Sequence, residues 1–245
     1  MDKVELLNRF DVKYQLIEDK LIQVLNAIKN DYYILEIGSS RVHNYNTIYY
    51  DTVEDTLYKD HHNGKLNRIK IRKRIYADSD LAFLEIKKKN NKRKTKKLRM
   101  VAENTGASFT KTELDFLTIN TNFEFHISKL TLPKRNTNSF KRITLVNKDF
   151  SERCTIDLRL VSYSDDKKVV MEKMAIIELK QGSLNEKTLL AKQLKECDIK
   201  QNGFSKYCMG RAFLEPQLKQ NLFKERIMQL KKQFNSKIAV SSLDI

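Results

Sequence analysis

The sequence predicts an α+β fold that is mainly β: a closed antiparallel eight-stranded β-barrel with peripheral and C-terminal helices. Three observations predict it. Eight stretches are rich in β-branched and aromatic residues or alternate apolar and charged residues with the period of a strand. Many of the charged positions in these stretches carry Lys or Arg, which repel one another on an open sheet. Stretches with helical spacing lie outside this strand set, near the N-terminal end, in the middle of the chain and toward the C-terminal end.

Size and composition favour one globular domain. The chain has 245 residues, of which 40% are hydrophobic and 32% charged, so we expect one domain over residues 1–235 and a flexible tail at 236–245. No run reaches the roughly 18 apolar residues of a membrane span, and the first ten residues lack a signal-peptide core, which predicts a cytoplasmic protein. Cys154, Cys197 and Cys208 show no metal-binding spacing and are expected to be reduced thiols.

The strand patterns follow one another with few interruptions. In 8–14, Phe10, Val12 and Tyr14 share one face while Asp11 and Lys13 share the other. The further strand patterns are 45–51, 66–76, 81–88, 96–101, 140–146, 153–161 and 169–179, with a turn signal at 62–64 between the second and third patterns.

The helices are predicted from three- and four-residue spacing. Leu21, Val24, Leu25 and Ile28 mark the first helix, and Pro216 stands at a favourable first-turn position of the last one. The predicted helices cover 21–28, 110–117, 122–130, 185–196 and 216–234. The last helix is either a lid on the barrel or a contact to a second copy or a membrane surface.

Charge suggests the ligand. Lys and Arg number 47 against 31 Asp and Glu, a net charge of +16, so the partners are polyanions: nucleic acid, an anionic membrane surface or polyphosphate. In 68–75, Arg68, Lys70, Arg72 and Arg74 fall on one face. In four further strand patterns the charged residues likewise share one face and apolar residues the other. The charged sets are Glu85 with Lys87, Lys97 with Arg99, Arg153 with Asp157 and Arg159, and Glu178 with Lys180.

Two arrangements explain this phasing. An open sheet with a solvated charged face is the ordinary one. Aligned like charges, however, destabilise a sheet by roughly 0.2–1 kcal/mol per pair. We therefore favour a barrel whose lumen binds a linear chain of phosphates, with the acids Glu85, Asp157 and Glu178 suited to a hard divalent metal ion.

Eight short motifs occur in a fixed order. They are Arg9-Phe-Asp-Val-Lys13-Tyr14, Tyr49-Tyr50-Asp51-Thr52, Lys70-Ile-Arg72-Lys-Arg74-Ile-Tyr76, Phe83-Leu-Glu85-Ile-Lys87, Lys96-Lys97-Leu-Arg99, Arg153-Cys-Thr155-Ile-Asp157, Ile177-Glu178-Leu-Lys180 and Phe204-Ser205-Lys206-Tyr207. In this order, from Arg9 to about Gly210, the chain resembles the VTC domain, the polyphosphate polymerase domain of the triphosphate tunnel metalloenzyme superfamily.

The resemblance implies roles for particular residues. The catalytic cations on the nucleotide phosphates and the growing chain would be Lys13, Arg72, Arg74, Lys87, Arg153 and Lys206. Supporting substrate contacts would come from Lys97, Arg99, Lys180 and Ser205, and Glu178 would hold a catalytic Mn²⁺ or Mg²⁺. Asp11 stands where many tunnel enzymes carry a Glu, and Glu85 is a further acid near the site. Alternatives are a salt bridge of Glu178 with Lys180, and an Asp157 that only orients an arginine.

The resemblance also implies an activity. The family transfers the terminal phosphoryl group of ATP to a polyphosphate chain whose own terminal oxygen attacks. A triphosphatase of the same fold is the first alternative, and a non-catalytic module that binds polyphosphate, RNA or anionic lipid is the second.

Two features bear on how this chain would act. Ile75-Tyr76-Ala77 and Lys88-Lys89 depart from the family pattern. The basic run 87–99 is either a solvated hairpin or an electrostatic funnel. We expect ATP and polyphosphate or triphosphate as partners, a separate membrane partner protein if the product is exported, and no specific nucleic acid, because no stacking platform for single strands is evident.

Overall fold

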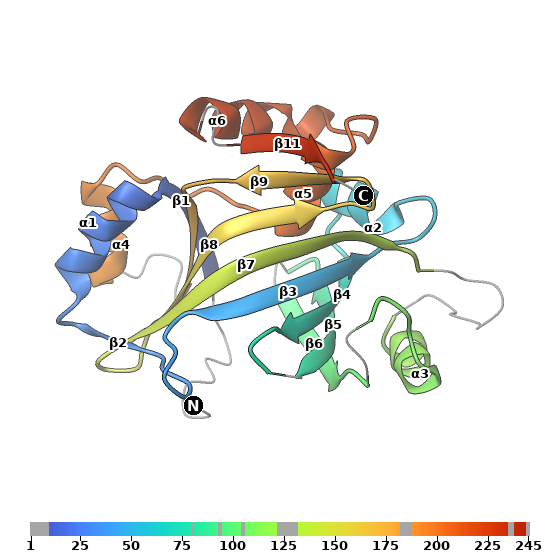
Figure 1. Ribbon diagram of the computed structural model, residues 1–245, viewed down its shortest axis with the longest axis horizontal. Helices are drawn as coiled ribbons and strands as arrows, with labels where there is room; N and C mark the ends of the chain where they lie inside the picture. Colours follow the sequence, from blue (N-terminus) through green and yellow to red (C-terminus); the bar gives the residue numbers. More distant parts are fainter. Residues whose placement is uncertain are drawn as a thin grey trace.

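Eight antiparallel strands form one continuous hydrogen-bonded path in the computed structural model (Figure 1). The structure describes residues 10–79, 81–92, 95–103, 106–121, 132–181, 188–234 and 238–243. The strand order is β1 (Phe10–Ile17), β10 (Met174–Gln181), β8 (Arg153–Tyr163), β7 (Lys134–Asn147), β3 (His43–Tyr50), β4 (Arg68–Tyr76), β5 (Ala82–Lys89) and β6 (Thr95–Val101). Each of the eight predicted strand patterns overlaps a strand of this set, so the mainly β, antiparallel prediction is confirmed.

Three shorter strands extend the sheet. β2 (Tyr32–Ile34) pairs with β7, β9 (Lys167–Met171) with β8, and β11 (Ile238–Ser242) with β9. The predicted strand at 169–179 is divided into β9 and β10 because Lys173 has a φ of 55°. The predicted flexible tail is wrong for β11, which forms a five-residue antiparallel ladder with β9.

The hydrogen-bonded barrel differs from the predicted closed one at a single seam. Within the described ranges no ladder joins β1 to β6. The free edge of β1 instead pairs with the segment before α5 (Lys206–Leu214). There the backbone N–H of Asn202 donates to the Lys13 carbonyl at 2.8 Å, and Tyr14 and Gln201 form an isolated antiparallel β-bridge. The segment therefore occupies the position in which β6 would close the sheet.

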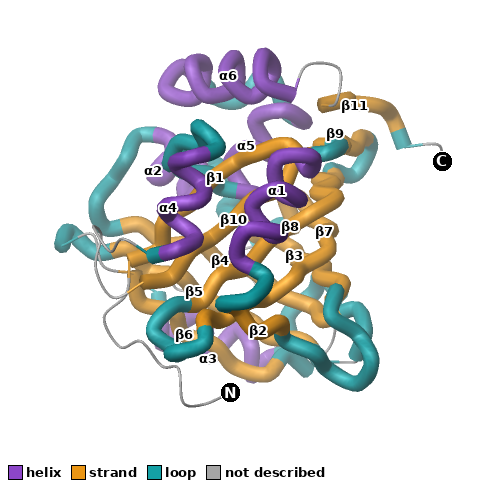
Figure 2. The backbone as a smooth tube through the Cα atoms, turned by 90° about the vertical axis from the view of Figure 1, so that its left-hand side faces the viewer, coloured by secondary structure: helices purple, strands orange, loops and turns teal. Residues whose placement is uncertain are grey.

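Two helices cover the outer face of β1, β10 and β8. α1 (Glu18–Ile28) and α4 (Leu189–Glu196) lie beside these strands in Figures 1 and 2. Val24 and Leu194 pack there with Val12 and Ile177, and all four are at most 2% exposed. The alternation of β1 thus points its apolar side chains to the helices and sends Lys13 to the opposite, inner face.

A third helix covers the outer face of β3, β4 and β5. α3 (Lys111–Asn120) begins with a capping box between Thr110 and Glu113 and packs Leu117 against Ile71 and Leu84. Below it, the Lys73 ammonium lies 3.0 Å from the Glu113 carboxylate, and both side chains are fully buried. Lys73 therefore belongs to the outer layer, unlike its neighbours Arg72 and Arg74.

Helix α5 fills one end of the interior. It lies behind β8 and β9 in the view of Figure 1, and its residues from Tyr207 to Leu214 are all buried. A Cβ on Gly210 would lie 2.6 Å from Ser162 Oγ and 2.8 Å from Asn136 Nδ2. The helix backbone at Gly210 therefore lies directly against side chains of β7 and β8. Met174, Ile176 and Leu160 join the same apolar cluster, which leaves the charged part of the interior at the other end.

The remaining helices are α2 (Thr56–His62), the 3₁₀ turn η1 (Asn221–Phe223) and α6 (Lys224–Phe234). The predicted helix at 216–234 is thus shorter than expected and begins after η1, whereas α2 and α5 were not predicted as helices. The helix predicted at 122–130 lies outside the described residues. Among the described residues, no helix has both the length and the apolar character needed to span a membrane.

Candidate active site

Arg72 and Glu85 form the most buried ion pair of the inner wall. They face each other across β4 and β5, and Arg72 Nε donates to the Glu85 carboxylate at 2.7 Å. Arg72 also donates to the Tyr49 hydroxyl at 3.2 Å. Burial opposes the charge of Glu85, but Arg72, Arg74 and Lys97 outweigh it and hold the pKa of Glu85 well below its usual range. The carboxylate is therefore ionised and orients Arg72.

Arg74 is a cation with spare hydrogen-bonding capacity. Its guanidinium lies 5.8 Å from the centre of the Tyr45 ring. Its Nε atom is inaccessible to solvent and has no hydrogen-bond partner within the described residues. Burial, together with the neighbouring Arg72, lowers the pKa of Arg74 to about 10. A buried donor of this kind fits an anion that would accept from it.

Lys13, Glu178 and Lys87 show that opposite walls converge. Lys13 of β1 and Glu178 of β10 are paired in register, with Lys13 Nζ 3.2 Å from the carboxylate. Lys87 comes from β5, which is five strands from β10 along the path. Its pKa is nevertheless lowered well below normal mainly by Arg72 and by burial, with Glu178 opposing the change. The inner faces of β1, β10, β4 and β5 therefore line one shared interior.

Burial disfavours the charge of Glu178, but Lys13, Lys180 and Lys87 outweigh it and keep the pKa of Glu178 well below its ordinary value. The predicted salt bridge with Lys180 is present at 3.7 Å. Burial also disfavours the charge of Lys13, but Glu178 raises the pKa of Lys13 above normal. Both groups are thus charged when no ligand is bound.

Asp157 holds two cations on the side of β7 and β8. Arg142 binds it with two hydrogen bonds, and Lys206 of α5 binds the same carboxylate. Despite burial, Arg142 and Lys206 hold the pKa of Asp157 far below its usual range. The structure thus gives Asp157 the arginine-orienting contact that the sequence offered as one alternative.

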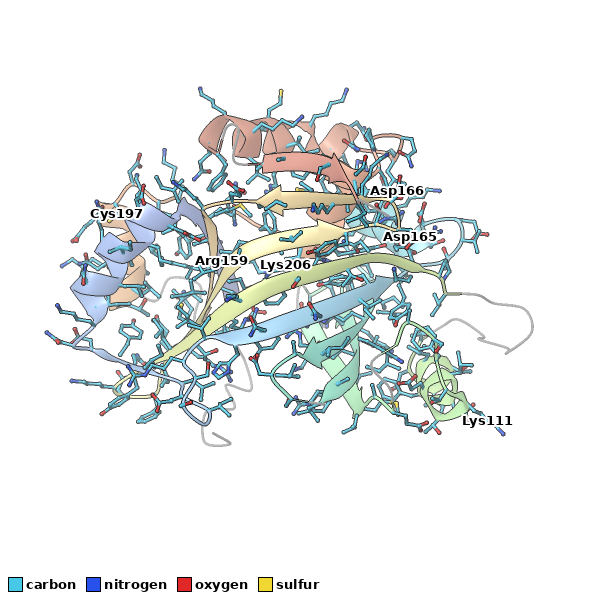
Figure 3. The ribbon with its side chains drawn as sticks, viewed as in Figure 1. Lys111, Arg159, Asp165, Asp166, Cys197 and Lys206 are labelled. Carbon is cyan, nitrogen blue, oxygen red and sulfur yellow. The ribbon has the colours of Figure 1, made fainter. Side chains whose placement is uncertain are left out.

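Ser205 connects the inner wall to α5. Its side chain accepts from the Cys208 amide as the N-cap of α5 and from Lys70 Nζ at 2.9 Å. The neighbouring Phe204 carbonyl accepts from Lys13 Nζ at 3.1 Å. The N-terminal turn of α5 is therefore fixed against β4 and β1, which aims Lys206 at Asp157 (labelled Lys206 in Figure 3).

Of the other predicted residues, Arg99, Arg153 and Asp11 lie at the end of the interior away from α5, which we call the open end because Arg99 and Asp11 are exposed there. Lys97 Nζ is 3.4 Å from Glu85, and Arg99 lies over the Phe83 ring at 4.8 Å. Arg153 and Asp11 stand directly opposite Lys180 in register, on its two neighbouring strands. All of the predicted residues that the structure describes are therefore on the inner wall or at its mouth.

Arg159 is the exception among the charged positions predicted to share this face. It has a φ of 52°, and the β7–β8 register shifts between Ser139 and Lys141. Because of this bulge, the exposed Arg159 (labelled in Figure 3) does not share the inner face with Arg153 and Asp157. A left-handed residue of this kind has no reliable signal in the sequence.

Sequence reasoning missed Arg142, Tyr49 and Tyr45 as members of the site. Each lies in a predicted strand or motif, and the two-residue period of a strand could have identified them. Tyr45 and Tyr49 are four residues apart and share a face of β3, and Arg142 is two residues from Phe140 on β7. Arg142 was hidden because Lys141 beside it offers an equally basic residue on the opposite face.

The acids of the site do not by themselves form a metal cage. Among the described residues no group of three His, Cys, Asp or Glu is placed to hold a metal ion. Glu178 supplies hard oxygen donors of the kind that Mg²⁺ and Mn²⁺ take, and Mg²⁺ commonly combines one or two carboxylates with substrate phosphates. The donor set fits a metal that arrives with a phosphate ligand.

The fold and the interior together define the class of the protein: a curled antiparallel sheet around an interior lined with cations. The VTC domain family model matches residues 8–215. The chain belongs to the VTC domain family. No curated protein matches the chain.

Three solved structures are similar to the chain at low sequence identity. A Hippeastrum protein, described as an adenylyl cyclase candidate with a dominant triphosphatase activity, is 12% identical with a TM-score of 0.51, over 83% of this chain and 96% of that one. The PH1819 protein of Pyrococcus horikoshii OT3 is 14% identical with a TM-score of 0.46, over 84% and 99%. The Pct1 RNA triphosphatase of S. pombe is 10% identical with a TM-score of 0.30, over 95% and 88%.

Proposed function

We propose that the chain is a polyphosphate polymerase that transfers the terminal phosphoryl group of ATP to a polyphosphate chain in its cationic interior, with a divalent metal. One observation carries the proposal. Cations from β1, β4, β5 and β7 and from α5 converge on one interior, and the buried Arg74 Nε has no partner there within the described residues.

The chain's residues would act by binding and alignment. Lys13, Arg72, Arg74, Lys87 and Lys206 would neutralise successive phosphates, with Arg153 at the mouth, and Lys97, Arg99, Lys180 and Ser205 would support them. No side-chain nucleophile is required, because the terminal oxygen of the polyphosphate chain attacks. Preorganised charges of this kind stabilise the charge that develops during phosphoryl transfer.

Glu178 would hold Mn²⁺ or Mg²⁺ together with phosphate oxygens. When bound, the metal supplies positive charge to the transferring phosphoryl group. The substrate phosphates would at the same time offer Lys13 and Lys180 new acceptors, which frees the Glu178 carboxylate to coordinate. This role predicts that Glu178 matters more for turnover than for phosphate binding.

The test is incubation of the purified chain with ATP and Mn²⁺ or Mg²⁺, with polyphosphate, ADP and free phosphate resolved. We expect long chains and ADP from the wild type and losses of at least about 100-fold in Arg72→Ala and Glu178→Gln, the size of effect seen when one preorganised contact is removed. Arg159→Ala is the control, because it removes an equal charge from outside the site. Polymer that persists at wild-type rate in Arg72→Ala and Glu178→Gln contradicts the proposal.

A triphosphatase is the second candidate, favoured by the fold shared with the Hippeastrum protein that has a dominant triphosphatase activity. Water would then replace the polyphosphate terminus as the attacking group. Free phosphate without polymer in the same assay, with the same dependence on Arg72 and Glu178, identifies this activity. A cytoplasmic location, a separate membrane partner and the lack of specific nucleic acid binding stay predictions of the sequence.

A further inference from the structure

Aromatic side chains gather at the open end of the interior. Tyr45 of β3 and Tyr76 of β4 are paired in register, with ring centres 4.9 Å apart. Tyr76 meets Phe83 of β5 edge to face at 6.0 Å. Tyr45 also stacks on Phe140 of β7 at 5.5 Å with nearly parallel rings. We call Tyr45, Tyr76 and Phe83 the aromatic rim.

The aromatic rim adjoins the phosphate-binding wall. Phe83 stands opposite Arg74 in the β4–β5 register, and Arg74 lies over Tyr45 at 5.8 Å. Tyr76 and Arg72 share a face of β4 and are four residues apart, or about 13 Å at the usual strand rise. A ribose and a short run of phosphates can fill that span.

The rim is not sealed into the core. Tyr45, Tyr76 and Phe83 are each half-buried, whereas Tyr49, Phe140 and Tyr207 are at most 5% exposed. The exposed Arg99 lies over Phe83 at 4.8 Å. Rings flanked by planar guanidinium groups offer stacking partners to a flat heterocycle.

We propose that the aromatic rim stacks the base of a nucleoside triphosphate whose phosphates extend inward past Arg74 to Arg72. The inference rests on the proposed function and deepens it, because it places the nucleoside at the open end and the reacting phosphates in the interior. It also separates two kinds of ligand: a nucleotide contacts both the rim and the wall, whereas an inorganic tripolyphosphate contacts the wall alone.

The test compares ATP with inorganic tripolyphosphate by calorimetry on the full chain, without metal so that neither is turned over. In Tyr76→Leu and Phe83→Leu we expect ATP to bind about tenfold more weakly, within the roughly 5- to 150-fold range of base stacking on an aromatic ring. Tripolyphosphate should bind within about twofold of its wild-type affinity. Tyr76→Phe keeps the ring and should keep the affinity for ATP.

Tyr33→Leu is the matched control, since Tyr33 is 51% exposed and stacks on Phe150 away from the interior. An equal loss of affinity for ATP and tripolyphosphate in the rim variants would mean that the rim only maintains the structure of the phosphate-binding wall. An unchanged affinity for ATP would mean that the base binds elsewhere. Either result overturns the inference but leaves the phosphate-binding interior intact. If the wild type binds neither ligand, the proposed function fails as well.

Discussion

Arg142 and Asp157 face each other directly across β7 and β8 and are joined by hydrogen bonds of 2.6 and 2.8 Å. Lys206 of α5 contacts the same carboxylate, so one acid orients two cations from different elements. The pair lies in the interior, where Asp157 is 1% exposed. Its geometry therefore determines where both cations point before any phosphate arrives.

Replacing this acid should expose its electrostatic role. In Asp157→Asn, Arg142 and Lys206 lose a buried counter-charge, and we expect unfolding free energy to fall by about 3–5 kcal/mol. Saturating tripolyphosphate should raise the melting temperature more in the variant than in the wild type, because the ligand replaces the lost negative charge. Thermal melting with and without ligand checks both statements, and equal ligand shifts in the two proteins would contradict the second.

Phosphate binding should depend on pH through Lys87. Arg72 and burial lower the pKa of Lys87 well below normal, so the free protein releases this proton at a lower pH than an ordinary lysine does. A bound phosphate favours the charged ammonium, so above the lowered pKa binding takes up to about one proton and affinity falls with rising pH. Calorimetry of tripolyphosphate binding in buffers of different ionisation enthalpy measures this uptake. Lys87→Arg, which stays charged, should abolish most of it.

The buried pair below α3 should matter for stability rather than for binding. Lys73 and Glu113 are both fully buried, and Lys73 also donates to the Ser108 carbonyl at 2.7 Å. Lys73→Met leaves Glu113 without its cation and should cost about 3–5 kcal/mol of unfolding free energy in urea. The double variant Lys73→Met/Glu113→Leu should recover much of that loss. No recovery in the double variant would argue against charge burial as the cause.

Helix α5 should tolerate no enlargement at Gly210. The added Cβ of Gly210→Ala would fall within 3 Å of Ser162 and Asn136, so either the helix or two strands must shift. We expect a loss of about 1–3 kcal/mol in unfolding free energy and weaker tripolyphosphate binding, because Lys206 moves with the helix. Ala212→Gly, a change of similar size on the same helix, should destabilise without adding a clash; if it weakens binding equally, helix stability rather than the clash is responsible.

Much of the fold was predictable because the strands obey a simple period. Arg72 and Arg74 alternate with Ile71 and Lys73, and the structure places the first pair inside and the second outside. Lys13 and Glu178 likewise come together from strands far apart in sequence, as the inward phase of each requires. The candidate site followed from this phasing together with the ordered motifs.

The parts that escaped prediction depend on backbone irregularities and tertiary contacts. The φ of 52° at Arg159 reverses the facing of that residue, and the φ of 55° at Lys173 divides one predicted strand into two. The tail at Ile238–Ser242 orders only because β9 offers an edge. Helix α5 is short and largely apolar all round, so its sequence shows no amphipathic stripe until the interior surrounds it.

The carboxylates of Glu85, Asp157 and Glu178 are ionic partners, in the absence of ligand, of six cations of the interior: Lys13, Arg72, Lys97, Arg142, Lys180 and Lys206. Under the proposed function, a phosphate that enters would replace a carboxylate as the ionic partner of these cations. Because such exchanges can occur one contact at a time, a polyanion would be able to shift along the wall while each of these cations, once released, returns to its carboxylate. Under the proposed function, the acids would allow a phosphate chain to advance along a surface that would otherwise bind it tightly.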